Sequence, residues 1–221
     1  MNTTNIMQSI VSRHSVRQYE NKMIETDKRK ILTDELEKIN KESGLNIQIL
    51  FDEPKCFDSF MAHYGKFSGV SNYISLVGKK GKDLDEKCGY YGERLVLLAQ
   101  TLGLNTCWVA MTHGKSSAKI NNGEKEVCLI ALGYGKTQGV PHKSKSLNDV
   151  TKVDKAVMPD WFKNGMEAVL LAPTAVNQQK FLFELNGDKV TAKVNGFAFY
   201  TKMDLGIVKY HFEIVTGKKV D

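Results

Sequence analysis

Residues 84–110 read LDEKCGYYGERLVLLAQTLGLNTCWVA and carry the strongest periodic signal in the chain. Apolar side chains recur there at alternating spacings of four and three residues, at Leu84, Cys88, Tyr91, Leu95, Leu98 and Leu102. This stripe predicts a long helix that is buried along one side. Gly103 is the expected residue just past its end, because glycine readily adopts the left-handed conformation that closes helices.

Two further helices are predicted before this one. The first covers residues 5–12, where apolar side chains recur at helical spacing. The second is expected to begin with Thr26 or Asp27 as its N-cap and to end at Gly44. The predicted buried face of this second helix consists of Ile31, Leu32, Leu36 and Ile39.

Strands are predicted where short apolar and β-branched runs lie between turn formers. These runs are residues 45–51, 73–77, 106–110 and 127–134. The last run is apolar nearly throughout, as expected of a central strand that is covered on both faces.

The C-terminal part predicts two more helices and a hairpin. A helix is expected over residues 160–171, and Pro173 is expected to start a second short turn, since proline is tolerated at the first helical position. Residues 181–194 predict a hairpin with Asn186-Gly187 in its tight turn. The last helix is expected to run from Asp204, as N-cap, to just before Gly217.

Together these elements predict an α+β fold, in which a central, mostly antiparallel sheet is flanked by helices. The polar and basic stretch 135–155 separates two regions of apolar patterning. We therefore predict a boundary there, between a first domain of residues 1–155 and a second of residues 156–221.

The composition is that of a soluble globular protein, because 42% of the 221 residues are apolar and 25% are charged. The net charge of +6 is too small and too scattered to indicate a nucleic-acid-binding protein. The four cysteines form no C-x-x-C pair and the five histidines lack zinc-like spacing, so we expect neither disulfides nor a metal site. No signal-peptide pattern or membrane-length apolar run occurs, and we expect a cytoplasmic protein that does not bind membranes.

Three polar clusters can carry chemistry. The first, residues 13–17 (RHSVR), sets two guanidinium groups beside a hydroxyl and an imidazole, and arginine suits a phosphate or a carbonyl-rich ring edge. The second is the basic loop 143–146 (KSKS), which can fold over an anion. The third, 172–179 (APTAVNQQ), combines small residues that let a flat ligand approach with amides that can bond its edge. Taken singly, each cluster is also typical of a solvated helix end or a surface loop.

In combination, these segments resemble the flavin-dependent nitroreductase family. RHSVRQY (13–19) is similar to that family's R-[RH]-S-x-[RK]-x-[FY] element, and residues 90–110 resemble its long central helix with the G-L-G-T-x-W entry to a strand. VCLIALGYGK (127–136) resembles the strand ending in G-Y, and PHKSKSLNDV (141–150) resembles the basic phosphate loop. APTAVNQQ is similar to A-P-[ST]-x-x-N-x-Q-P, except that Lys180 replaces the final proline.

The resemblance implies that bound FMN performs the chemistry, so that no catalytic side chain and no metal is needed. It implies that Arg13 and Ser15 contact the phosphate and ribityl chain, and that Lys143 and Lys145 neutralise the phosphate. Arg17 is expected to tune the ring from its N1/C2 edge. The remaining implied cofactor-binding residues are His14, Val109, Ala110, Thr174, Ala175, Asn177 and Gln179.

One departure from the family pattern concerns spacing. The third cluster ordinarily follows the R-R-S-x-R element by a few tens of residues, whereas more than 150 separate them here. The chain after residue 156 also repeats the family's order of elements, including a D-L-G-I helix start at 204–207. We therefore expect a fused, degenerate pair of halves with one composite FMN site, acting as a monomeric internal pseudo-dimer. A homodimer, and a C-terminal segment that is merely an extension packed on the core, stay open.

The implied activity is that of an FMN-dependent oxidoreductase, which transfers electrons from NADH or NADPH to nitroaromatic, quinone or similar small acceptors. No G-x-G-x-x-G follows a predicted strand, so a separate Rossmann domain is excluded. Two other classes stay open: a non-catalytic binding module on the same scaffold, and a basic nucleic-acid or anionic-surface binder. Bleaching of a bound flavin by NADH or NADPH would indicate the oxidoreductase. Steep salt dependence of binding would indicate the nucleic-acid or anionic-surface binder.

Overall fold

The structure is a computed structural model that describes residues 3–221, and it divides into two compact units. The first, called the sheet unit, consists of Arg13–Leu84 and Leu95–Val140. The second, called the hairpin unit, consists of Met1–Ser12, Asp85–Arg94 and Pro141–Asp221. Each unit is therefore assembled from separate pieces of the chain. The predicted domains 1–155 and 156–221 remain a prediction.

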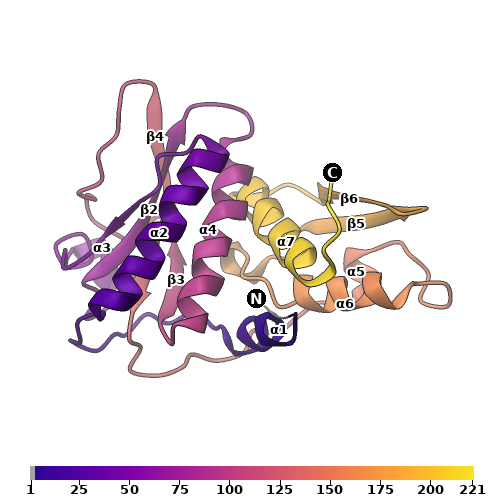
Figure 1. Ribbon diagram of the computed structural model, residues 1–221, viewed down its shortest axis with the longest axis horizontal. Helices are drawn as coiled ribbons and strands as arrows, with labels where there is room; N and C mark the ends of the chain where they lie inside the picture. The colour runs from indigo at the N-terminus through magenta and orange to yellow at the C-terminus, as the bar shows by residue number, and fades with distance from the viewer. Residues whose placement is uncertain (1–2) are drawn as a thin grey trace. The chain divides into compact units, whose positions relative to one another are not determined.

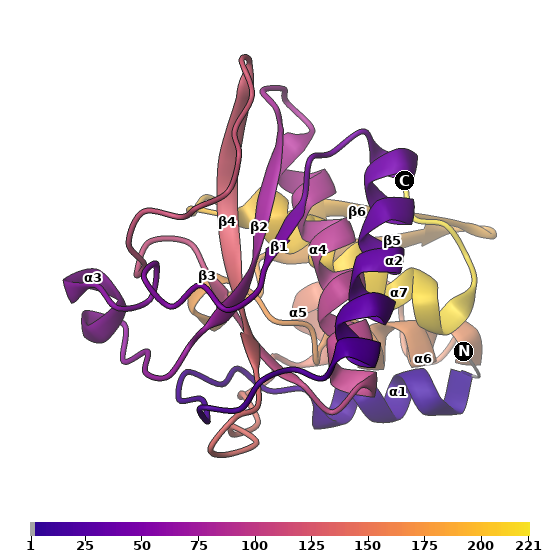
Figure 2. The same cartoon turned by 60° about the vertical axis from the view of Figure 1, so that its left-hand side comes forward.

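The sheet unit contains one antiparallel sheet with the strand order β1-β2-β4-β3. Its strands are β1 (Gln48–Leu50), β2 (Asn72–Lys79), β3 (Asn105–Val109) and β4 (Glu124–Gly133). β4 lies between β2 and β3, and its residues 128–133 are buried, which confirms the predicted central strand. Figure 2 shows β1, β2 and β4 running side by side. The predicted α+β class with a mostly antiparallel sheet is confirmed.

Helices α2 (Thr26–Ser43), α3 (Phe60–Tyr64) and the second half of α4 (Leu84–Thr101) complete the sheet unit. The predicted long helix is confirmed as α4, and Gly103 beyond it has the expected positive φ of 73°. α2 ends at Gly44 as predicted, with a φ of 71°. Its N-cap, however, is Glu25 and not Thr26 or Asp27, because Arg29 N already donates to Glu25 O at 3.0 Å.

One part of the core of the sheet unit contains a group of buried aromatic side chains. The ring of Phe57 lies 5.3 Å from that of Phe67 and 5.7 Å from that of Tyr73, centroid to centroid. Val16 and Tyr19, which belong to the segment after α1, are buried in the same cluster. The residues just after the first helix are therefore anchored in this core.

The hairpin unit holds most of the remaining elements. They are α1 (Thr3–Ser12), the first half of α4, α5 (Leu147–Val150), α6 (Asp160–Val169), the 3-10 turn η1 (Ala175–Asn177), β5 (Phe181–Asn186), β6 (Lys189–Val194) and α7 (Thr201–Thr216). Within this unit, α7 packs against α1, α6 and the hairpin β5-β6; Figure 1 draws α7 in yellow, α6 and the hairpin in orange, and α1 in indigo. Phe212 of α7 lies at the centre, with its ring stacked 5.3 Å from that of Phe183 and 5.5 Å from that of Phe162.

Three local predictions in this unit were wrong in detail. The short turn begins at Ala175 and not at Pro173, because Thr174 before it is still extended. In the hairpin, Asn186 pairs with Lys189, so Gly187, with a φ of 60°, takes the first turn position alone. The last helix begins at Thr201 after a left-handed Tyr200, which places Asp204 inside its first turn and not at the N-cap. Its predicted end before Gly217 is confirmed.

Helices α4 and α7 cross within the hairpin unit at two glycines (Figure 1). A Cβ added to Gly89 would lie 2.0 Å from Met203 O, and a Cβ added to Gly206 would lie 1.9 Å from Glu86 O. Met203 and Glu86 each precede the glycine of their own helix by three residues. The contact is therefore reciprocal, as in a two-fold symmetric interface, where residue i contacts j and j contacts i.

Candidate functional site

The basic segment 13–17 lies along β3, the edge strand of the sheet unit. Val16 N donates to Thr106 O at 3.1 Å, and Ser15 pairs with Thr106 in a parallel bridge. Val16 is buried, whereas Ser15 and Arg17 are exposed, as expected of an extended segment whose side chains alternate between faces. The fold thus presents a polar edge that an apolar anchor holds in place.

The charged side chains of this segment gather near one thiol on β3. Burial raises the pKa of the Cys107 thiol. The charge of Arg17, the hydroxyl of Ser15 and the charge of Arg13 act in the opposite direction, in that order. Arg13 is buried, at 3% exposed, and the Arg17 guanidinium lies 5.8 Å from the ring centroid of Phe67. The two guanidinium groups and the hydroxyl that the sequence singled out thus all act on this one thiol.

The loop after β4 packs closely over the same segment. Gly139 has a φ of 73°, and a Cβ on it would lie 2.8 Å from the Cβ of His14 and 2.9 Å from Ser15 O. Only glycine fits this approach, which holds the backbone of residues 14 and 15 in place. His14 itself is half-buried.

Val109 and Ala110, at the end of β3, differ in their surroundings. Val109 is 2% exposed, and its carbonyl accepts a hydrogen bond from Cys128 Sγ at 3.2 Å. It belongs to the core of the sheet unit. Ala110 follows the strand and is half-buried, so it is the more accessible of the two.

The second and third predicted clusters meet in the hairpin unit, and Gln179 joins them. Lys145 N donates to Gln179 Oε1 at 2.8 Å, and Lys145 Nζ donates to Gln179 O at 2.9 Å. Gln179 Nε2 in turn donates to Lys143 O at 3.0 Å and to Asn177 Oδ1 at 2.8 Å. Since Gln179 is 3% exposed and its amide bonds the protein, it holds the two loops together.

The other residues of these clusters are more accessible. Lys143, Lys145 and Asn177 are exposed, and Asn177 Nδ2 donates to Lys143 O at 2.9 Å. Thr174 is half-buried, and its Oγ1 accepts a hydrogen bond from Gln179 N at 3.1 Å. The lysines and the Asn177 amide thus form one polar surface.

The backbone of the third cluster is strained. Val176, Asn177 and Gln179 have φ values of 46°, 55° and 47° in the left-handed region. This region costs a residue with a Cβ on the order of 1–2 kcal/mol, and β-branched residues rarely adopt it. Val176 is 97% exposed, so packing of its side chain does not offset that cost. Strain of this kind is concentrated at functional sites.

Asp204 belongs to this cluster, although the sequence predicted only a helix cap there. Its carboxylate accepts hydrogen bonds from Ala175 N at 2.9 Å and from Gln178 Nε2 at 2.6 Å. Burial raises the pKa of Asp204 to about 6, and the two hydrogen bonds act in the opposite direction. The D-L-G-I motif marks the helix start, but no local pattern points to a partner 29 residues earlier.

The predicted site residues thus form two clusters, one in each compact unit. Among residues 3–221, no group of three or more His, Cys, Asp or Glu side chains could hold a metal ion. The four cysteines are buried thiols. In the described part of the chain, no helix combines the length and the apolar character needed to cross a membrane.

Comparison with known proteins shows that this architecture is the nitroreductase fold. A crystal structure described as a putative nitroreductase from Thermotoga maritima is 23% identical, with a TM-score of 0.70 over 97% of this chain and 85% of that one. A nitroreductase structure from Desulfovibrio desulfuricans, described as putative and in complex with FMN, is 16% identical with a TM-score of 0.50, over 65% and 93% of the two chains. The search of curated proteins found no match.

The family itself is shown by a sequence profile. The profile described as "Putative TM nitroreductase" matches residues 5–216, which is nearly the whole chain. The chain therefore belongs to this nitroreductase family, as its sequence motifs indicated.

Proposed function

We propose that this chain binds FMN and is an oxidoreductase that passes electrons from NADH or NADPH to small acceptors such as nitroaromatics and quinones. Membership of the nitroreductase family supports an oxidoreductase role. The observation that carries the proposal is that the segment 13–17 runs along the edge strand β3, where Ser15 pairs with Thr106 and Ser15 and Arg17 are exposed. A reducing, cytoplasmic location is part of the proposal, and the four buried thiols support it.

The side chains present fit this cofactor. Two guanidinium groups and a hydroxyl match a phosphate and a ribityl chain, because arginine forms paired hydrogen bonds with such oxygen atoms. At Gly139, the absent side chain lets the loop approach the backbone of His14, which leaves this backbone well fixed for a ligand. When bound, FMN supplies the electron transfer, and the protein supplies binding and orientation.

We assign the following roles in the sheet unit. Arg13 and Ser15 bind the phosphate and ribityl chain, and His14 contributes its backbone N–H. The exposed Arg17 guanidinium stabilises negative charge at the N1/C2 edge of the ring, since an opposite charge nearby favours the ionised form. The backbone at Val109 and Ala110 lines the ring.

In the hairpin unit, we assign Lys143 and Lys145 to charge neutralisation of the phosphate. Thr174, Ala175 and Asn177 are assigned to contacts with the pyrimidine or ribityl groups. These residues are exposed or half-buried, so a ligand can reach them. Gln179 acts differently, because its buried amide fixes the loops that carry the others.

We also propose that the chain is a fused pair of degenerate halves with one FMN site. The reciprocal contact of Gly89 with Gly206 supports this, since α4 and α7 meet there as two-fold related helices would. The side chains around this crossing have diverged, as Tyr90 Oη donates to Glu213 Oε2 at 2.8 Å without a counterpart at the related positions. Position 207 is isoleucine, which has no hydroxyl to donate.

The visible absorption spectrum tests the proposed function most directly. The purified protein is reconstituted with FMN, desalted, and measured before and after anaerobic addition of NADH or NADPH. A retained flavin spectrum that bleaches supports the proposed oxidoreductase. A colourless protein contradicts it and favours a binding module on the same scaffold.

Cofactor stoichiometry and sedimentation test the fused-halves proposal. We expect one FMN per chain in a monomer. Two FMN per chain, or a flavin site that exists only in a dimer, would overturn it.

A further inference from the structure

The segment 174–179, in which Val176, Asn177 and Gln179 are left-handed, is held by a carboxylate from α7. Asp204, in the first turn of α7, is 3% exposed. Its Oδ1 accepts a hydrogen bond from Ala175 N at 2.9 Å, and its Oδ2 accepts one from Gln178 Nε2 at 2.6 Å. One hydrogen bond fixes the beginning of the segment and the other fixes its far side.

The segment needs such a restraint, because its own side chains contribute little packing. Val176 and Asn177 are left-handed, and both are exposed. An exposed side chain gains nothing from packing that would offset an unfavourable backbone conformation, so other contacts must hold it. Asp204 supplies two of these contacts from the interior of the hairpin unit.

We propose that Asp204 is a positioning residue for the cofactor site, acting through Ala175 and Gln178 to hold the segment in its ligand-binding conformation. This inference rests on the proposed function, since it names what fixes one of the proposed FMN-contacting segments. Asp204 touches no ligand in this scheme. Its carboxylate sets where the Asn177 amide and the neighbouring backbone lie.

Gln178, which binds Asp204, also contacts a second loop. Gln178 Nε2 also donates to Phe199 O at 3.0 Å, so one amide group links the segment, Asp204 and the loop before α7. Phe197 and Phe199 in that loop are 95% and 84% exposed, and Lys180 Nζ donates to Phe197 O at 2.8 Å. Asp204 therefore orders two accessible loops at once.

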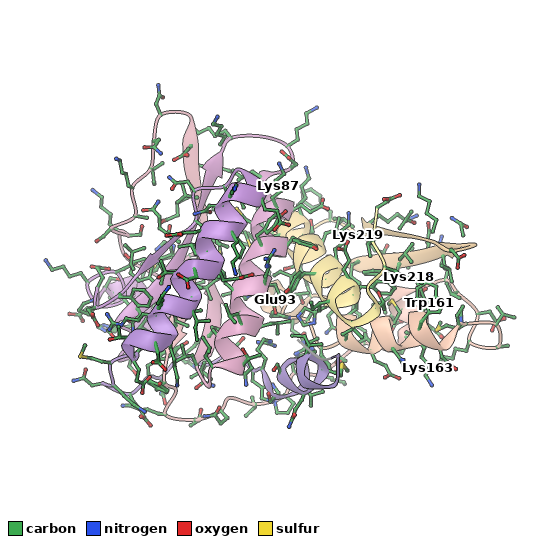
Figure 3. All side chains as sticks on the ribbon, in the orientation of Figure 1. Lys87, Glu93, Trp161, Lys163, Lys218 and Lys219 are labelled. Carbon is green, nitrogen blue, oxygen red and sulfur yellow. The ribbon has the colours of Figure 1, made fainter. Side chains whose placement is uncertain are left out.

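The position on α4 that corresponds to Asp204 carries no carboxylate. Asp204 precedes Gly206 by two residues, and the residue two before Gly89 is Lys87, which is labelled in Figure 3. An ammonium group donates hydrogen bonds and accepts none, so it cannot bind two N–H groups. At this one symmetry-related position the carboxylate is replaced by an ammonium group, in agreement with a single cofactor site.

The test compares Asp204→Ala, Asp204→Asn and Gln178→Ala with the exposed hairpin control Asp188→Asn. Hydrogen exchange of the FMN-free proteins is followed by mass spectrometry over residues 174–180 and over the hairpin 181–194. We expect Asp204→Ala to speed exchange in the first region about tenfold or more and to leave the second unchanged. Asp204→Asn should fall between Asp204→Ala and the unaltered protein, because its amide oxygen can still accept from Ala175 N.

FMN affinity is then measured by quenching of flavin fluorescence. We expect Asp204→Ala to weaken FMN binding about tenfold or more and to change the visible circular dichroism of the bound flavin. Adding Gln178→Ala to Asp204→Ala should weaken FMN binding by less than Gln178→Ala does alone, since the hydrogen bond that the two residues share is already lost. Unchanged exchange and unchanged affinity in Asp204→Ala would overturn the positioning role while leaving FMN binding intact. Failure of the unaltered protein to bind FMN would instead overturn the proposed function, and the exchange data would still report whether Asp204 holds the segment.

Discussion

His211 of α7 and Glu93 of α4 form a hydrogen-bonded pair in which neither side chain is exposed to solvent. His211 Nε2 lies 2.9 Å from Glu93 Oε1, and Nδ1 lies 2.9 Å from Ala168 O (Figure 3 labels Glu93). A carbonyl only accepts, so Nδ1 donates its proton to Ala168 O. The pair joins three helices of the hairpin unit, α4, α6 and α7.

Removing the Glu93 carboxyl group should be strongly destabilising. Glu93→Ala leaves a buried imidazole without its partner, and breaking a buried pair in this way costs about 3–5 kcal/mol. Glu93→Gln can donate its amide N–H to Nε2, so we expect a loss of about 1 kcal/mol. Urea unfolding of the three proteins checks this, and equal losses for the two variants would contradict it.

The helix crossing predicts that two glycines tolerate no side chain. Gly89→Ala and Gly206→Ala would each place a Cβ about 2 Å from a backbone oxygen, so the helices must move apart. We expect a loss of about 3 kcal/mol or more in the free energy of unfolding. Gly81→Ala is the matched control, because its nearest neighbour is the movable Asp83 carboxylate at 3.1 Å. A small loss at both helix positions would contradict the close crossing.

The charge of Arg17 predicts a shift in reduction potential. If the guanidinium stabilises the anionic reduced ring, Arg17→Ala should make the potential more negative, by roughly 30 mV for each ~1.4 kcal/mol of lost stabilisation, and should slow turnover. Arg17→Lys keeps the charge and should recover most of the potential. Equilibration with a reference dye measures it, and an unchanged potential in an FMN-bound Arg17→Ala protein refutes this role.

Asp204 predicts that stability falls as its carboxyl group ionises. Its pKa is about 6 in the folded protein, compared with about 3.9 in an unfolded chain. The fold thus favours the protonated form, and this stabilisation, about 3 kcal/mol, is present below pH 4 and is lost as the pH rises through 6. Asp204→Asn should remove this slope, which urea unfolding of the FMN-free protein between pH 4 and 7 can measure. Parallel pH profiles for the two proteins would contradict the assignment.

FMN affinity should rise with pH in the same range, whereas the stability of the fold falls. The ionised carboxylate is the stronger hydrogen-bond acceptor at both oxygen atoms, so the contacts to Ala175 and Gln178 are strongest above pH 6. The unaltered protein should therefore bind FMN more tightly at pH 7 than at pH 5, by a larger factor than Asp204→Asn does. A larger gain in Asp204→Asn would argue against the positioning role.

Sequence patterns predicted those parts of the fold that depend on nearby residues. The stripe from Leu84 to Leu102 has a helical period and the β4 run is continuously apolar, so both elements could be predicted from nearby residues alone. Turn and cap details depend on pairing elsewhere. Asn186 looked like a turn residue, but its pairing with Lys189 leaves the positive φ to Gly187 alone.

In the candidate site, too, contacts between nearby residues could be predicted, whereas contacts between distant segments could not. Arg13, Ser15 and Arg17 are close in sequence, so their gathering beside β3 could be expected from the pattern. The contacts of Gln179 with Lys143 and Lys145 span more than 30 residues, and those of Asp204 span 26 and 29. Such contacts arise only when distant segments pack, and a single sequence carries no local signal for them.

The division of the chain into interleaved pieces has a consequence for its synthesis on the ribosome. The sheet unit is complete once Val140 has emerged, but the hairpin unit draws on Asp85–Arg94 and on everything after Pro141. At roughly 5–20 residues per second, the roughly 80 remaining residues take on the order of 4 to 16 seconds to appear. During that interval Ile6 and Ile10 of α1, both buried in the finished protein, lack the α6 and α7 surfaces that pack against α1. The nascent chain therefore passes through a stage with apolar surface open to chaperones and to aggregation.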